Sequence, residues 1–289
     1  MIMLKEHQTL EERQEAFELS QNNPDLLFIH AALCSSVNGQ HVKLFAYPFN
    51  SPVYWFLLNV QKNATPMVII AQDGDSYDRS TFLTGLKLFN EKTRFLRHAS
   101  RIEFGAEAHL MHEIAKFVIH AEGHRPGTRR EHHVFYMTPD QMDRVQQVEC
   151  TLPYGFEYSY LTKEDAEELI MQSESKQSVE SFKRRIENLP SSCIRQSSSG
   201  AVVSRELRSF SGAMVDQYTV PEYRRQGLGQ AVEISLAQKI INLDETPFKL
   251  VPTYLTSILL SSQESPFWSI WSRNTLPVPY VLQTFTKTL

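Results

Sequence analysis

The sequence predicts a protein of the mixed α/β (α+β) class, built from two domains in which helices flank mixed β-sheets. The chain has 289 residues, and at roughly 150 residues per domain this length suggests two compact units. Segments with the period of a strand alternate along it with segments of helical period. A turn-rich segment at 138–153 separates the halves, so we expect domains at 1–149 and 150–289.

The first half mixes helices and strands. Apolar spacing predicts helices over 10–18 and 107–120, and apolar runs predict strands over 41–47, 67–71 and 133–137. Residues 124–133 are basic and contain proline and glycine. They indicate a solvated loop, with contact to a ribose phosphate as the alternative.

The second half has a more regular order of elements. Strands are expected over 155–160, 192–195, 201–207 and 212–220, with helices over 163–171 and 179–189 between the first two of them. A long helix is expected over 227–242, because Leu228, Val232, Leu236 and Ile240 recur every four residues. A strand over 248–251, a helix over 254–262 and a strand over 278–285 complete the chain.

Composition argues against several classes of protein. The formal net charge of -4 provides no broad positive field for nucleic acid. The chain has an odd number of cysteines, Cys34, Cys150 and Cys193, which favours a reducing compartment. They lack CxxC spacing, which argues against a zinc site. Lys116 stands where an H-E-x-x-H motif starting at His112 needs its second histidine, so no metal is expected. The apolar runs are shorter than the ~20 residues of a membrane span, and the acidic first twenty residues lack a signal-peptide core.

The feature that carries chemistry is the turn between the strand ending at Val220 and the long helix. It reads Arg224-Arg225-Gln226-Gly227-Leu228-Gly229. The first amides of a helix lack intrahelical partners and the helix dipole adds positive charge, so a helix start binds phosphate. The glycines allow close approach of the backbone, and the arginines add charge-assisted hydrogen bonds. The turn predicts a pyrophosphate site, with a basic turn that only caps the helix as the alternative. The residues expected at this site are Tyr218, Thr219, Val220, Arg224, Arg225, Gln226, Gly227, Leu228 and Gly229.

This order of elements, with the phosphate turn after the fourth strand, resembles the GNAT acyltransferase fold. Three segments are similar to the glycine N-acyltransferase family: 219–224 (TVPEYR), 237–239 (AQK) and 271–274 (WSRN). The similarity extends into the first half at 37–47, 67–71 and 134–137. It implies an N-terminal GNAT-like domain without a phosphate turn.

The same resemblance implies transfer of an acyl group from coenzyme A to the amino group of glycine or a related amino acid. Acyl-CoA would be a co-substrate, with no permanently bound cofactor, and its pantetheine arm would lie along the strand that ends at Val220. A mitochondrial location is implied by the family, although no presequence is recognisable, and a cytoplasmic location is the alternative.

The catalytic residues of the family are only partly matched. The family's carboxylate base falls at Ala213, so Asp216 is the nearest substitute and Glu206 the second. In regular alternation along the strand, Asp216 points to the opposite side of the sheet from Ala213, unless a β-bulge changes its direction. Tyr254 is the phenol closest to the position of the usual thiolate-protonating tyrosine. Three interpretations stay open: an amino acid N-acyltransferase, a non-catalytic acyl-CoA-binding protein, and an enzyme that acylates protein amines.

Overall fold

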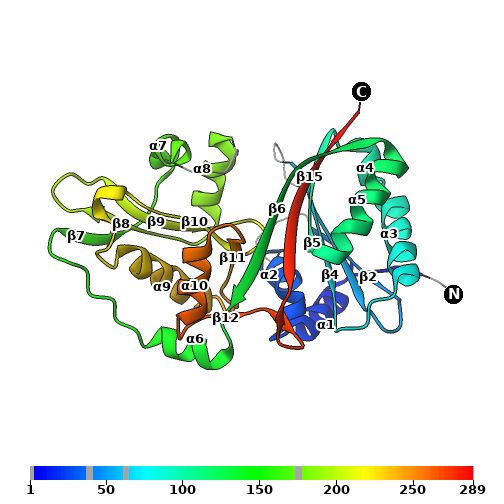
Figure 1. Cartoon of the computed structure of the whole chain (residues 1–289), viewed down its shortest axis with the longest axis horizontal. Helices are drawn as coiled ribbons and strands as arrows, with labels where there is room; N and C mark the ends of the chain where they lie inside the picture. The colour runs from blue at the N-terminus through cyan, green and yellow to red at the C-terminus, as the bar shows by residue number, and fades with distance from the viewer. Residues whose placement is uncertain (1–2, 37–41, 61–64, 173–177, 289) are drawn as a thin grey trace. The chain divides into compact units, whose positions relative to one another are not determined.

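The structure, a computed structural model, describes residues 3–36, 42–60, 65–172 and 178–288 and contains two compact units (Figure 1). Unit 1 comprises Met1–Val134, Val251–Gln263 and Ile270–Leu289, and unit 2 comprises Phe135–Leu250 and Glu264–Ser269. The mixed α/β class is confirmed. The division differs from the boundary expected at residue 150, because the C-terminal strand β15 (Pro279–Lys287) is part of unit 1.

The sheet of unit 1 has parallel neighbours at one place only among its described strands. Its order is β1 (Lys5–Glu6), β2 (Val42–Tyr47), β3 (Tyr54–Asn59), β4 (Met67–Gln72), β5 (Arg101–Glu107), β15 and β6 (His124–Tyr136). Strands β4 and β5 run parallel, and the other neighbours are antiparallel. The helices that precede β6 are α1 (Leu10–Ser20), the short η1 (Pro24–Leu26), α2 (Leu27–Ser36), α3 (Arg79–Thr93), α4 (Phe95–His98) and α5 (Ala108–Glu122), and α10 (Thr256–Glu264) comes later in the chain.

Both faces of β4 are buried, which explains its continuous apolar sequence. Val68 and Ile70 belong to a core that also contains Phe82 of α3 and Ile114 of α5. The neighbouring Ile69 lines a cavity with residues of η1 and α2. Figure 1 shows α3 and α5 on one side of these strands and α2 on the other.

The expectation of a solvated loop at 124–133 is wrong. This segment belongs to β6, which pairs with β15 from His124 opposite Lys287 to His133 opposite Pro279. The pairing partner lies about 150 residues away in sequence, so no local pattern predicts it. The strand expected over 41–47 is present as β2, except that residue 41 lies outside the described residues.

Unit 2 has the element order expected from residue 155 to residue 250. Its strand order is β11 (Phe248–Pro252), β10 (Met214–Thr219), β9 (Val202–Arg208), β8 (Ser191–Gln196) and β7 (Phe156–Ser159). Only β10 and β11 are parallel in this described sheet. Helices α7 (Ala166–Met171) and α8 (Val179–Asn188) lie on one side of it and α9 (Leu228–Ile241) on the other (Figure 1).

Alternation along the strands of unit 2 builds two separate core layers. Cys193 and Leu207 pack with Phe182 of α8, whereas Ile194 packs with Val232 of α9. Helix α6 (Pro139–Gln146) also packs against α9. Both units therefore share one plan, in which a helix follows one strand and leads into its parallel neighbour: β4–α3–β5 and β10–α9–β11.

Candidate functional site

The amino end of α9 is the centre of the candidate site. Gly227 is its N-cap residue and has φ 79°, a left-handed conformation that favours glycine. Within the described chain, no side chain caps this helix start. The first-turn amides at 228–230 therefore have no intrahelical partner and can bind an anion. A Cβ atom at Gly227 would meet open space, so the backbone conformation is what requires glycine here.

Two arginines flank this helix start and are exposed to solvent. Arg224 Nε donates to the carbonyl oxygen of Thr219 at 2.9 Å, which ties the turn to the end of β10. Arg225 has φ 62° and is exposed to solvent. Exposed guanidinium groups beside uncapped amides give this turn the chemistry of a phosphate site.

Strand β10 carries a β-bulge immediately before the turn. Val215 pairs with Leu207 and Tyr218 pairs with Arg205, so three steps along β10 oppose two along β9. The extra residue is accommodated at Asp216, whose φ is 56°. Towards β11, the ladder contains a single pair, Met214 with Lys249. Beyond Met214 the described ladder ends, and this stretch of the edge of β10 is not paired with β11.

The bulge sets the direction of the Asp216 side chain. Its Oδ2 accepts a hydrogen bond from Arg185 Nη1 at 2.7 Å, and Arg185 is 1% exposed on α8. Asp216 therefore faces the α8 side of the sheet. A second buried arginine, Arg205, interacts electrostatically with the same carboxylate. Asp216 is the counter-ion of a buried cationic pair.

Glu206 lies on the opposite face, towards α9, in a buried polar cluster. Its side chain lies near the Lys249–Glu233 ion pair, and Gln217 Nε2 lies 3.5 Å from its Oε2. Burial raises the pKa of Glu206 well above its usual range, and the negative charge of Glu233 raises it further. Trp268 donates its indole N–H to Glu233 at 3.2 Å, which completes the cluster.

Ala213, at the position of the family's carboxylate, and Tyr254, the third candidate, are placed differently. Ala213 is fully buried just before β10, so the family position for a carboxylate is occupied by core packing. Tyr254 belongs to unit 1, precedes α10 (Thr256–Glu264) and is 61% exposed. The structure brings Tyr218, Thr219 and the turn residues of unit 2 together, and it leaves Tyr254 in the other unit.

Unit 1 has a turn at the equivalent place, between β4 and α3, with opposite chemistry. It contains Asp73, Asp75 and Asp78, and Asp78 Oδ1 caps α3 by accepting from the amide of Thr81 at 2.6 Å. Beside it, Arg273 donates to both oxygens of Glu107, at 2.5 and 3.0 Å.

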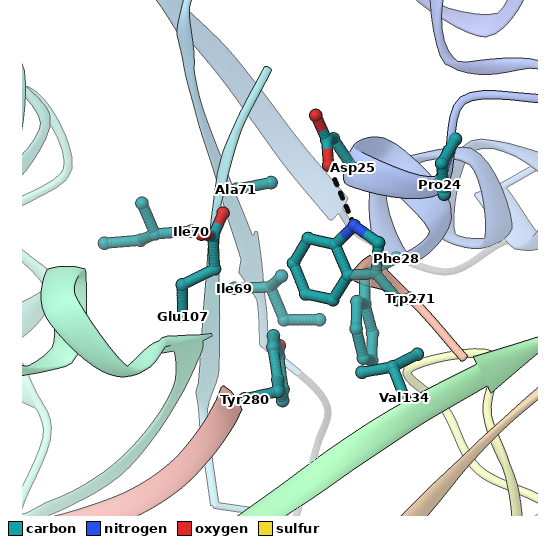
Figure 2. A pocket seen from close by; sticks show the side chains of 10 residues that line it. All are labelled: Pro24, Asp25, Phe28, Ile69, Ile70, Ala71, Glu107, Val134, Trp271 and Tyr280. Atoms are coloured by element: carbon teal, nitrogen blue, oxygen red, sulfur yellow. Dashed lines mark hydrogen bonds between the residues drawn. The ribbon is translucent and has the colours of Figure 1, made fainter. Parts of the chain in front are cut away.

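Glu107 also lines a small cavity of about 10 Å³ in unit 1, together with Asp25 and Trp271. Figure 2 shows Trp271 there, with its indole N–H donating to Asp25 at 2.8 Å, close to Phe28 and Tyr280. Burial raises the pKa of Glu107 to about 7, although Arg273 lowers it. This cavity has room for about one water molecule.

Sequence reasoning missed the buried charges around β9 and β10. They are Arg185, Arg205, Arg208, Glu245 and Lys249, with the partly buried Glu233 as the partner of Lys249. A signal was present, because 204–206 (SRE) is a polar run within the fully buried strand β9. Charged residues in such a strand need partners on both of its faces.

Comparisons with solved structures show the fold of the whole chain. A Drosophila protein of a structural genomics programme matches with a TM-score of 0.73 at 12% identity, covering 98% of each chain. A GCN5-related N-acetyltransferase from Sphaerobacter thermophilus matches with a TM-score of 0.52 at 12% identity, over 98% of this chain and 96% of that one. A GCN5-related N-acetyltransferase from Kribbella flavida gives 0.53 at 11% identity, over 95% and 96%.

A tandem GNAT protein from the clavulanic acid pathway has a TM-score of 0.50 at 10% identity and covers 98% of both chains. The chain therefore has the two-domain GNAT fold expected from its sequence. No protein-family model and no curated protein matches it. Among the described residues, no helix is both long enough and apolar enough to cross a membrane.

Proposed function

We propose that the chain is an acyl-CoA-dependent N-acyltransferase whose donor binds at the amino end of α9. The uncapped helix start with Gly227 as N-cap and two exposed arginines is the observation that carries the proposal. The GNAT fold supports it, since its solved neighbours include N-acetyltransferases. The stretch of β10 that is not paired with β11 offers backbone groups to the amides of the pantetheine arm.

The proposed acceptor is glycine or a related amino acid. Arg185 and Arg205 lie on the α8 side of β10 with the carboxylate of Asp216. Glu168 also acts electrostatically on Arg205. The resemblance to the glycine N-acyltransferase family points to the same class of acceptor.

The acceptor amine must lose a proton before it attacks the thioester carbon. Attack forms the amide bond and releases the thiolate of coenzyme A, which takes up a proton. We assign the role of proton acceptor to Asp216, because it lies on β10 itself and its carboxylate pairs with Arg185 at 2.7 Å. Glu206 and Tyr254 are the other candidates: Glu206 is buried in its own cluster, and Tyr254 would act as the acid that protonates the thiolate.

The proposal is tested by calorimetry with acetyl-CoA and by a thiol-release assay with glycine between pH 6.5 and 9.5. Gly227→Val should abolish acetyl-CoA binding. Gly123→Val is the matched control, because Gly123 also has a positive φ, 66°, and open space around its Cβ position, at the carboxyl end of α5 in unit 1. Equal affinity in both variants would rule out the site.

The rate of thiol release should rise with pH until the amine titrates, because only the deprotonated amine attacks. A non-catalytic acyl-CoA-binding protein is the second candidate, and buried Ala213 at the family's carboxylate position favours it. Acetyl-CoA binding without thiol release for any amino acid would identify that case. Release with lysine-containing peptides but not with free amino acids would identify an enzyme that acylates protein amines.

A further inference from the structure

A cavity of about 280 Å³ lies in unit 2 beside the phosphate turn. Its walls come from the 148–153 segment that precedes β7, from the first two turns of α9 and from Phe267. Gln226 and Gly227 belong both to this cavity and to the phosphate turn. A ligand anchored by phosphate at the helix start can therefore extend directly into the cavity.

The cavity and strand β10 lie on opposite flanks of α9. Gly227, Gln230 and Ile234 line the cavity, and their spacing of three and four residues places them on one flank. Gly229 lies on the other flank, where its carbonyl oxygen accepts from Gln217 Nε2 of β10 at 3.0 Å. Two paths thus diverge from the same helix start.

The lining of the cavity selects the chemistry of its occupant. None of its lining side chains carries a charge. Leu152, Ile234 and Phe267 provide apolar walls, and the amides of Gln226 and Gln230 provide both donors and acceptors. A flat heterocycle with hydrogen-bonding edges fits this combination, since aromatic side chains stack on bases and amides bind their edges.

We propose that this cavity holds the adenine base of acyl-CoA, while the pantetheine arm follows the opposite flank of α9 along β10. The proposal rests on the proposed function, because a pyrophosphate at the helix start is the common origin of both arms. The ribose phosphate stays outside, where solvent and exposed arginine side chains can balance its charge. The nucleotide end is thus recognised by unit 2 alone.

The test compares coenzyme A with 4′-phosphopantetheine, which lacks the nucleotide, by calorimetry on the full chain. Thr151 lines the cavity and is exposed, so Thr151→Trp fills the cavity from its rim. We expect its affinity for coenzyme A to fall roughly tenfold or more and its affinity for 4′-phosphopantetheine to stay within about twofold. Gln147→Trp is the matched control, since Gln147 is exposed nearby but does not line the cavity.

A second variant, Gln230→Leu, keeps the volume and removes an amide, and it should also weaken coenzyme A selectively. Unchanged affinity for coenzyme A in both variants, or an equal loss for both ligands, would overturn the adenine assignment and leave the proposed function standing. Wild-type protein that binds neither ligand would contradict the proposed function itself. Circular dichroism confirms that each variant is folded.

Discussion

The two strand-to-helix turns occupy the same place in the shared plan and have opposite chemistry. In unit 1, the turn from β4 to α3 carries three aspartates, and Asp78 satisfies the start of α3. In unit 2, the turn from β10 to α9 carries two exposed arginines, and its helix start has no side-chain cap among the described residues. A capped acidic turn repels phosphate, whereas an uncapped basic turn attracts it.

The edges where the parallel strands part differ in the same way. In unit 1, Arg273 enters beside the ends of β4 and β5, donating to the carbonyl oxygen of Gln72 at 2.8 Å and to Glu107. Trp271 and Asp25 complete this closure (Figure 2). In unit 2, β10 is not paired with β11 beyond Met214. We conclude that one plan has been used twice, once closed by the chain's own side chains and once in a form suited to a ligand.

The largest effect is expected from removing the ion pairs of Arg273 in unit 1. At about pH 8, above the pKa of Glu107, Arg273→Ala should destabilise unit 1 by about 3–5 kcal/mol, because it leaves Glu107 buried, and Asp25 partly buried, without their cation. Denaturant unfolding measures the loss, with the exposed Arg101→Ala as control. Guanidinium at low millimolar concentration should restore part of the stability. A change below about 1 kcal/mol would show that the ion pairs do not hold this closure together.

The closed unit should also weaken as pH rises. The pKa of Glu107 is raised from 4.5 to about 7, so the folded unit binds a proton that the unfolded chain has lost between these values. The associated stability is complete below about pH 4.5 and is lost by pH 7, on the order of 3 kcal/mol. Hydrogen exchange in β4 and β5 at pH 5 and 7.5 measures it.

Glu107→Gln is the matched variant, because it keeps the shape of the neutral acid. It should remove most of the loss of stability between pH 4.5 and pH 7. The part that comes from Glu103 should stay, because burial also raises the pKa of Glu103. If the stability of Glu107→Gln changed with pH as much as that of the wild type, the pH dependence would belong to another group.

These expectations also show what the sequence could and could not provide. The helical row from Leu228 to Ile240 and the glycine–arginine turn are local, so the phosphate site could be recognised from residue order alone. The pairing of β15 with β5 and β6 joins segments about 150 to 185 residues apart, and nothing local encodes it. The sequence of residues 124–133 therefore predicts a loop where the structure has a strand.

The direction of the Asp216 side chain cannot be predicted from the sequence either. One inserted residue reverses the face of the sheet to which every later side chain points. The bulge is visible only once Val215 and Tyr218 are paired with their partners on β9. The buried arginine beside Asp216 comes from α8, about 30 residues earlier. Spatial clusters of this kind need the fold before they can be seen.

If chemistry belongs to unit 2 alone, Asp216→Asn should lower the rate of thiol release by on the order of 100-fold while acetyl-CoA affinity stays unchanged. Asp78→Asn is the control in unit 1, since asparagine also caps a helix and this carboxylate has no part in the proposed site. Glu206→Gln should change the rate little. A large loss in Glu206→Gln with none in Asp216→Asn would transfer the proton acceptor to the buried cluster.

A smaller effect is expected from the basic turn itself. Arg225→Ala should weaken acetyl-CoA binding roughly tenfold, the value of one charge-assisted hydrogen bond at an exposed site. The loss should shrink as salt screens the interaction. Arg225→Lys distinguishes simple charge from the planar guanidinium, and full recovery by lysine would show that charge alone is needed.

The central claim is that the chain has one donor site, in unit 2, although it contains the same plan twice. Calorimetric titration of acetyl-CoA tests it most directly, with Gly227→Val and its counterpart Gly74→Val. Both glycines have positive φ, 79° and 78°, and open space at their Cβ positions, so the two substitutions impose similar strain on equivalent turns. We predict one acetyl-CoA per wild-type chain, no binding in Gly227→Val and unchanged binding in Gly74→Val. Two molecules per chain, or loss of binding in Gly74→Val but not in Gly227→Val, would contradict it.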